Sequence, residues 1–233
     1  MQAPFFRLVT APLIALLAAG CGAPPVPFHT MLAQLGQAPL RHEHVEKQYL
    51  FTLDYRPSWS FVIDDLKALQ QDPPIQTAAV ADLVRNHRDS VQFVLSVGPR
   101  PDLPEAERKS ADIVHFHPDQ PSYSAHLNKL MYGMNHNIYL VTADKRRVPV
   151  ALYHLERNWG MGETNRFLLQ FPRGRDDDDL AKQEHLELVL QHLHPSLVEV
   201  RLQLNPNPVA ASEPSPQRLA ESLALEPEKK QKP

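Results

Sequence analysis

The sequence predicts a mainly β protein, a two-sheet antiparallel sandwich (immunoglobulin-like) with short helical insertions. Two observations lead to this prediction. Six or seven segments alternate apolar and polar side chains with the two-residue period of a half-buried strand. Each of these segments keeps one polar face, and strands that are apolar on a single face bury it best by packing as two layered sheets.

The strand predictions follow from the side chains that share a face. In the last strand, Val198, Val200, Leu202 and Leu204 lie on one side, and charged or amide side chains lie on the other. Asp144-Lys145-Arg146-Arg147 separates two of the strands and predicts a hairpin turn. The predicted strands are Tyr49–Tyr55, Val91–Val97, Asn137–Thr142, Val148–Leu155, Arg166–Phe171, Leu186–Leu190 and Leu197–Leu204.

The helices are predicted as insertions between strands. Residues Ile75–Asn86 follow two prolines and space their apolar side chains at helical intervals, and Pro121–Tyr132 shows a similar spacing. The pattern of Ser58–Gln71 fits a strand or a helix equally well.

The first 21 residues resemble the signal and lipobox of bacterial lipoproteins. Arg7 precedes an apolar run of about 12 residues, which is shorter than the about 20 that a membrane-spanning helix needs. The run ends in Leu17-Ala18-Ala19-Gly20-Cys21, with Ala18 where the family usually has Leu. The resemblance implies cleavage before Cys21 and acylation of Cys21 with fatty acids such as palmitate. Since Gly22 replaces the Asp that retains lipoproteins in the inner membrane of enteric bacteria, we expect the outer membrane in a Gram-negative source.

The chain therefore divides into four predicted parts. Residues 1–20 form the signal peptide, 21–27 a lipid anchor with a Pro-rich tether, and 28–204 a β-rich globular domain. Residues 205–233, rich in proline and charge, are predicted to be a disordered tail. Cys21 is the one cysteine of this sequence, so disulfides and thiolate sites are excluded from the folded domain.

Composition, charge and the absence of known motifs reduce the set of functions that the sequence allows. The formal net charge is −3 and no long basic run occurs, so nucleic acid is not an expected partner. Nucleophile-elbow, His-Glu-x-x-His and P-loop motifs are absent from the sequence. Paired carboxylates of a hydrolase are not recognisable in a linear sequence, so Glu43, Asp54, Asp64, Asp65 and Glu163 stay open as candidates.

Histidine is the enriched functional residue, with 12 in the chain. Three pairs are spaced His-x-His, which on a strand turns both imidazoles to one face: His42/His44, His115/His117 and His192/His194. We take His115, His117, His192 and His194 as candidate ligands of Zn²⁺ or Cu²⁺. A solvated strand or loop collects histidines as well, and this remains the competing explanation.

A second candidate is the loop around Trp159. Arg157, Trp159 and Glu163 lie between two predicted strands, and a Trp on a loop offers a stacking face for a sugar or a peptide. Burial of Trp159 at the end of the sandwich is the alternative. Asp176-Asp177-Asp178-Asp179 fails the EF-hand pattern because Ala181 stands where glycine is needed.

Three functions are compatible with these features. The first is a non-enzymatic binding or assembly module held at the membrane, which contacts an envelope protein or glycan through a sheet edge or the Trp159 loop. The second is a His-based metal-binding envelope protein. The third is an envelope hydrolase with a carboxylate pair, for which Glu163 is the residue to replace. The first agrees with all the patterns above, and it requires no cofactor.

Overall fold

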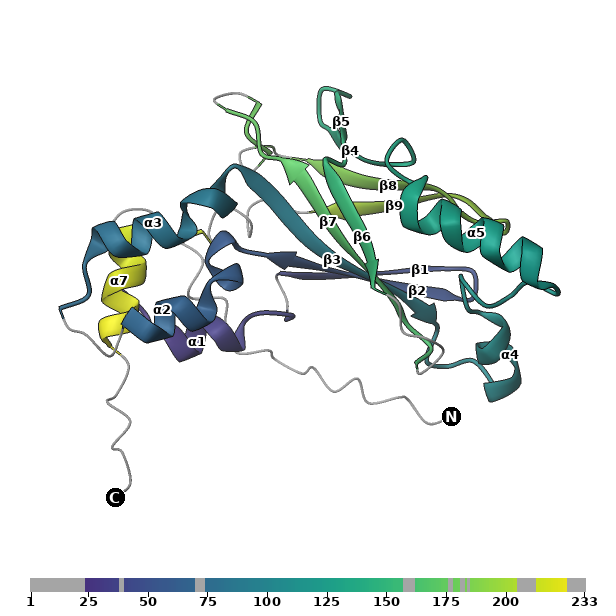
Figure 1. Cartoon of the computed structure of the whole chain (residues 1–233), viewed down its shortest axis with the longest axis horizontal. Helices are drawn as coiled ribbons and strands as arrows, with labels where there is room; N and C mark the ends of the chain where they lie inside the picture. The colour runs from purple at the N-terminus through teal and green to yellow at the C-terminus, as the bar shows by residue number, and fades with distance from the viewer. Residues whose placement is uncertain are drawn as a thin grey trace, which may run out of the picture.

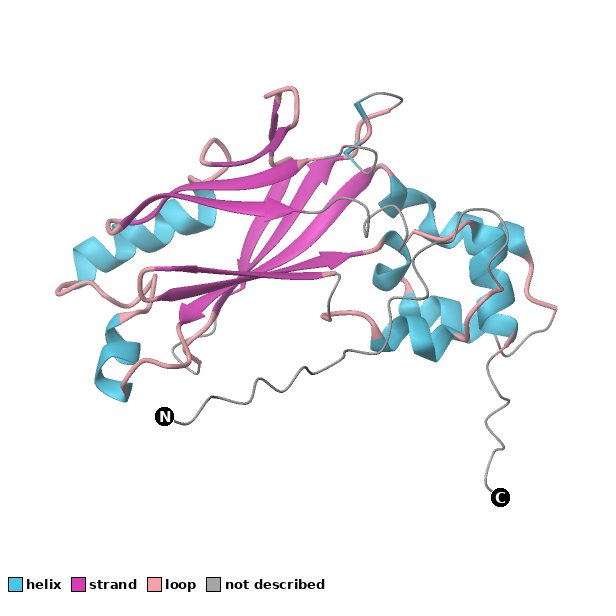
Figure 2. Ribbon diagram, turned by 180° about the vertical axis from the view of Figure 1, so that it is seen from behind, coloured by secondary structure: helices cyan, strands magenta, loops and turns pink. Residues whose placement is uncertain are grey.

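The computed structural model contains two antiparallel β-sheets packed face to face, which confirms the predicted fold class. It describes residues 24–37, 40–69, 74–156, 162–175, 178–180, 183, 185–204 and 213–225. Figure 2 shows the two sheets as adjoining layers, with the helices gathered beyond their ends.

Five strands form the first sheet, in the order β1-β2-β3-β7-β6. They are β1 (Arg41–Glu46), β2 (Tyr49–Arg56), β3 (Ser90–Pro99), β6 (Leu152–Glu156) and β7 (Asn165–Pro172). The second sheet has the order β5-β4-β8-β9. Its strands are β4 (Ile138–Thr142), β5 (Arg147–Pro149), β8 (Leu186–His194) and β9 (Leu197–Leu204). Every pairing is antiparallel.

The core between the sheets is built from the alternating faces that the sequence predicts. In β7, Phe167, Leu169 and Phe171 are buried while the side chains between them are more exposed. The predicted apolar face of β9 is wrong at one position. Val198 is 63% exposed and Leu197 is buried in its place, because a β-bulge between Gln191 and His194 shifts the register where β8 meets β9.

Residues Val148–Leu155 form two strands in different sheets, where the sequence predicts a single strand. The predicted hairpin does form between β4 and β5. The chain then changes sheets within two residues: the N–H of Val150 bonds to Ile138 in the second sheet, and that of Ala151 bonds to Gln170 in the first. Pro149 ends β5 because it has no N–H with which to continue a ladder.

Both predicted helical insertions are present, as α3 (Thr77–Arg88) and α5 (Gln120–Tyr132). The ambiguous segment around residue 60 forms a 3-10 turn, η1 (Ser58–Phe61), followed by α2 (Ile63–Leu69). Two further short helices are α1 (Phe28–Ala33) and α4 (Glu105–Ser110). β1 is not among the predicted strands, because its six residues are mostly polar, as is common for an edge strand.

Helices gather at the two ends of the sandwich (Figure 1). We call α1, η1, α2, α3 and α7 (Pro216–Ala224) the helical lobe. Its core is a second cluster of buried residues, separate from the core between the sheets. The cluster contains Phe28, Met31, Trp59, Leu66, Val80, Val84, Leu219, Ala220 and Leu223. The opposite end carries α4 and α5, and we call it the α5 end.

The prediction of a disordered tail over 205–233 is wrong for residues 213–225. Ser215 caps the N-terminus of α7 by accepting a hydrogen bond from the Arg218 N–H, and Pro216 stands at its first position. Leu219 and Leu223 lie one turn apart on one face, and both are 1% exposed. The spacing of these leucines fits a helical turn, and the helix is ordered because this apolar face packs on the other helices of the lobe.

Glu213 fixes the start of this C-terminal segment. Its carboxylate accepts a hydrogen bond of 2.8 Å from the Tyr55 hydroxyl, and further bonds from the backbone N–H and the hydroxyl of Ser58. Arg88 donates to the carbonyl of Pro214 at 2.9 Å. The segment is therefore attached to β2, η1 and α3 before α7 begins.

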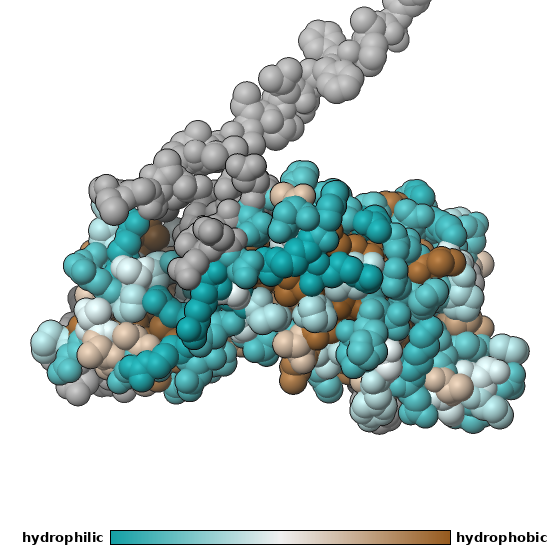
Figure 3. Space-filling view, turned by 90° about the horizontal axis from the view of Figure 1, so that it is seen from above, coloured by the Kyte–Doolittle hydropathy of each residue, from teal (hydrophilic) through white to brown (hydrophobic). Residues whose placement is uncertain are grey.

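The surface carries apolar side chains on separate elements. Val45, Phe61, Tyr132, Leu152, Leu168, Val198 and Leu225 are the large exposed ones among the described residues. The face seen from above is mainly hydrophilic, with smaller hydrophobic areas (Figure 3). Within the described ranges, no helix has both the length and the apolar content required to cross a bilayer.

Candidate functional site at the α5 end

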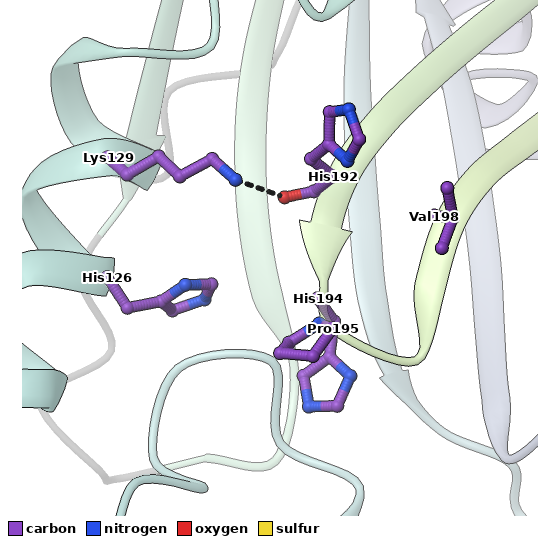
Figure 4. A pocket seen from close by; sticks show the side chains of 6 residues that line it. All are labelled: His126, Lys129, His192, His194, Pro195 and Val198. Atoms are coloured by element: carbon purple, nitrogen blue, oxygen red, sulfur yellow. Dashed lines mark hydrogen bonds between the residues drawn. The ribbon is translucent and has the colours of Figure 1, made fainter.

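A small pocket opens between α5 and the turn that joins β8 to β9. Its volume is about 130 Å³, and it is lined by His126, Lys129, His192, His194, Pro195 and Val198. Figure 4 shows His126 and Lys129 extending from α5 toward the β8–β9 turn, where Lys129 Nζ donates to the carbonyl of His192 at 3.1 Å. Among the residues that the structure describes, neither aspartate nor glutamate lines it.

Local sequence signals place both walls of the pocket. Asp119 caps α5 by accepting hydrogen bonds from the N–H and hydroxyl of Ser122, and Pro121 stands within the first turn. On the other wall, His192 has a positive φ of 56° at the β-bulge. A non-glycine residue in this region is uncommon and holds the turn in a conformation that a regular hairpin does not adopt.

Three imidazoles meet around one phenylalanine beside the pocket. The ring of Phe116 lies 3.9 Å from that of His117, 5.1 Å from that of His126 and 4.0 Å from that of His194, measured between centroids. The rings of His117 and His126 are 4.9 Å apart. We call these four residues the histidine cluster. They come from the loop after α4, from α5 and from β8, so the cluster joins three parts of the chain.

Hydrogen bonds assign the protons on two of these rings. His126 Nε2 lies 2.9 Å from the carbonyl oxygen of Ile113. Since a carbonyl oxygen only accepts hydrogen bonds, Nε2 carries the proton, and Nδ1 of the neutral ring carries a lone pair. His194 Nδ1 accepts the backbone N–H of Ser196 at 3.0 Å, so its proton is on Nε2.

Two ring nitrogens of the cluster are buried without a hydrogen-bond partner among the described residues. They are Nε2 of His117 and Nε2 of His194. The Phe116 ring meets that of His194 edge to face, at 64°, and an aromatic face is a weak acceptor for a buried N–H. Such a contact suits a neutral imidazole that has no carboxylate partner.

The surroundings disfavour a positive charge on two of the histidines. Burial lowers the pKa of His194 to about 4, and the nearby His126, His117 and Lys47 act in the same direction. Burial also lowers the pKa of His126, partly offset by its hydrogen bond to Ile113, and His117 and Lys129 lower it further. Both rings are therefore neutral at pH 7.

Two acidic groups close to the cluster, Asp112 and Asp119, accept hydrogen bonds from neighbouring groups, and the charge of Asp119 also interacts with His117. Asp119 caps α5. Asp112 accepts hydrogen bonds from the Val114 N–H at 2.7 Å and from Asn165 Nδ2 at 3.1 Å, and its second oxygen lies 2.8 Å from His115 Nδ1. The positive groups are Lys129 on α5 and Lys47, which donates to the carbonyl of Ser196. The α5 end thus presents nitrogen-bearing side chains without a balancing carboxylate in the pocket.

The four predicted metal ligands do not converge. His115 stacks on Tyr123 with its Nδ1 toward Asp112. His192 and His194 both line the pocket, but a bulge interrupts the regular strand between them and His192 is exposed. His117 and His194 do share the cluster, with Phe116 against both rings. The described residues contain no group of three or more His, Cys, Asp or Glu that is arranged to hold a metal ion. Metal binding stays a prediction from the sequence.

None of the other predicted site residues that the structure describes lines the pocket. Arg157 and Trp159 lie outside the described residues, as does Cys21. Glu163 forms an ion pair with Arg108 of α4. Of the other candidate carboxylates, Asp54 is held by Arg41 through two hydrogen bonds of 2.6 Å and 2.9 Å. His42 and His44 both lie on β1 and share a face, as the His-x-His spacing predicts.

Sequence reasoning missed His126 and Lys129. Both lie on α5, three residues apart and therefore on neighbouring positions of one helix face. The available signal was this i, i+3 spacing inside a helix that had been predicted. The His-x-His spacing, which applies to strands, does not include these two residues.

Acidification is expected to destabilise the protein through His194. The folded-state pKa lies below the unfolded value of about 6.5, so the stability contributed by the neutral ring is complete above pH 6.5. It is lost as the pH falls from about 6.5 to about 4. His194→Asn keeps an acceptor for Ser196 and cannot titrate, so its urea midpoint should fall less between pH 7 and pH 4.5 than that of the unmodified protein. His154→Asn, at an exposed position of β6, is the matched control and should follow the unmodified protein. An equal fall of the urea midpoint in all three proteins would contradict the assignment of this pH dependence to His194.

Comparison with known proteins finds one solved structure that is similar to this chain. No family model and no curated protein matches the chain. A solved protein of unknown function from Burkholderia pseudomallei K96243 is similar over 82% of this chain and 88% of that chain, at 14% identity and a TM-score of 0.36. At this TM-score the likeness supports no argument about function.

Proposed function

We propose that the protein is a lipid-anchored envelope lipoprotein whose sandwich is a non-enzymatic binding module, with the α5 end as its docking face for an envelope protein or glycan. The lipobox-like sequence ending in Cys21 supports the anchor, and Gly22 favours the outer membrane. The observation that carries the binding role is the pocket beside the histidine cluster, at the end of the sandwich opposite the helical lobe.

The position of the pocket relative to the anchor supports this assignment. α1 begins seven residues after Cys21, and seven extended residues span about 25 Å at most. The length of the tether therefore keeps an acylated Cys21 within about 25 Å of the start of the helical lobe, which contains α1. The α5 end lies beyond the sandwich, where a partner in the aqueous compartment can reach it.

Cross-linking in cells tests both parts of the proposal. Formaldehyde treatment of the intact lipoprotein should yield one partner adduct, and Lys129→Ala should reduce it several-fold because Lys129 lies at the pocket wall. Lys67→Ala, which removes an exposed lysine of α2 in the helical lobe, is the matched control and should leave the adduct unchanged. Cys21→Ser should release the protein from the membrane fraction. An adduct that Lys67→Ala removes and Lys129→Ala spares would place the docking face elsewhere.

A further inference from the structure

We infer that the pocket at the α5 end binds an oxyanion, the acidic group of the partner, and that His126 takes up a proton as the anion enters. This inference rests on the proposed function and names the chemistry that the docking face recognises. It is carried by the side chains of the pocket wall, by the hydrogen bonds that fix the protons of the cluster, and by the size of the pocket.

The pocket wall is suited to an anion. Its described lining presents the ammonium of Lys129 and three imidazoles, and contains no carboxylate. Lys129 uses one N–H on the carbonyl of His192, which leaves it two more to donate. A volume of about 130 Å³ accommodates a single carboxylate, sulfate or phosphate group, and it is too small for a whole sugar chain or a folded segment.

Proton uptake follows from the state of His126. Its Nε2–H is committed to the carbonyl of Ile113, and its Nδ1 is a lone pair while the ring is neutral. A neutral ring offers an oxyanion no charge, whereas a protonated imidazole in the pocket wall attracts it. The free protein disfavours that proton because the ring is half-buried, and because His117 and Lys129 act against a positive charge there. The carboxylates of Asp112 and Asp119 accept hydrogen bonds from other groups. An oxyanion supplies the negative charge that makes the proton favourable.

Binding and protonation are therefore coupled. An anion that binds the protonated form more tightly raises the pKa of His126, so acid in turn strengthens anion binding. If one proton enters with each anion, the association constant rises by roughly tenfold for each unit by which the pH falls. This holds at pH values above the pKa of His126 in the free protein. A neutral ligand that donates a hydrogen bond to Nδ1 would bind without this dependence.

Titration with sulfate tests the inference, because sulfate keeps its charge between pH 5 and pH 8. The imidazole Cε1–H resonances are followed by NMR in the purified protein at pH 7.5, 6.5 and 5.5, with chloride at equal ionic strength as the reference. We expect saturable shifts of the His126 and His194 resonances that chloride does not produce, with an affinity that increases as the pH falls. Acetate, measured in parallel, distinguishes a planar carboxylate from a tetrahedral oxyanion as the preferred group.

Two variants separate the contribution of Lys129 to sulfate binding from that of His126 to its pH dependence. Lys129→Ala should weaken sulfate binding by roughly tenfold, a typical loss for one charge-assisted hydrogen bond of about 1.5 kcal/mol. His126→Gln should remove most of the pH dependence, and His154→Gln should change nothing. Shifts equal to those in chloride, or binding unchanged in Lys129→Ala, would overturn the oxyanion site. Affinity that does not vary with pH would overturn the proton uptake.

The sulfate titration and the cross-linking in cells can fail independently, so a failure of the oxyanion inference is distinguishable from a failure of the proposed function. If the partner adduct in cells depends on Lys129 while sulfate and acetate do not bind, the docking face stands and the oxyanion inference falls. If sulfate binds as expected while no partner adduct depends on Lys129, the site exists and the proposed docking role is wrong.

Discussion

Leu223→Ala in α7 is expected to lower the free energy of unfolding by about 3 kcal/mol, since truncating a fully buried leucine typically costs 2–5 kcal/mol. Leu223 is 1% exposed in the cluster of the helical lobe, where it packs among residues from α1, η1, α2 and α3. The cluster has far fewer members than the core between the sheets, so each of its side chains carries a larger share of its stability.

Urea unfolding of the purified protein measures this effect. Leu225→Ala is the matched control: Leu225 follows α7 directly, is 49% exposed, and its replacement should stay within about 0.5 kcal/mol. Leu219→Ala should resemble Leu223→Ala, and ending the chain at Leu204 should cost more than either because α7 and the Glu213 contacts are then lost together. Little change in Leu219→Ala and Leu223→Ala would mean that α7 does not stabilise the lobe, as a disordered tail would predict.

Asp112→Ala is expected to have the second large effect, again about 3 kcal/mol, because it leaves buried donors without an acceptor. Asn165 is 2% exposed and donates its side-chain N–H to Asp112, and the backbone N–H of Val114 donates to the same oxygen. These bonds hold the loop that carries Phe116 and His117, so the variant should also disturb the histidine cluster.

The pH dependence of Asp112 supports this role. Burial alone would raise the pKa of Asp112, but the hydrogen bonds from Val114, His115 and Asn165 outweigh it and the pKa is lowered. The ionised carboxylate thus stabilises the fold above its unfolded pKa of about 3.9, and the contribution is lost as the pH falls below that value. Asp82→Ala, at an exposed position of α3, should leave urea unfolding unchanged. Unchanged urea unfolding of Asp112→Ala would contradict the stabilising role of these hydrogen bonds.

The fold class could be predicted because alternation is a local property of each strand. Phe167, Leu169 and Phe171 lie on one face by backbone geometry alone, whatever their partners are. The register between strands is not local, so alternation alone does not show the bulge that exposes Val198 or the change of sheet within Val148–Leu155. The ordering of α7 was missed for a related reason: its partners are more than 100 residues away in sequence.

The candidate site was less predictable than the fold. The histidine cluster joins His117, His126 and His194, of which the sequence analysis selected two, from different pairs. The His-x-His spacing carries information on a regular strand, as in β1, but His115 and His117 lie on a loop and a bulge separates His192 from His194. What brings the cluster together is the packing of α5 against the β8–β9 turn, which a linear pattern does not contain.

Site-specific photo-cross-linking in cells tests the central claim most directly, that a partner docks at the α5 end of an anchored lipoprotein. A photoreactive amino acid is placed at Val198, an exposed position of the pocket wall, and separately at Phe61, an exposed position of the helical lobe. We expect an adduct with one envelope protein or glycan from position 198 that Lys129→Ala reduces, and no such adduct from position 61. An adduct formed from position 61 and absent from position 198 would contradict the account.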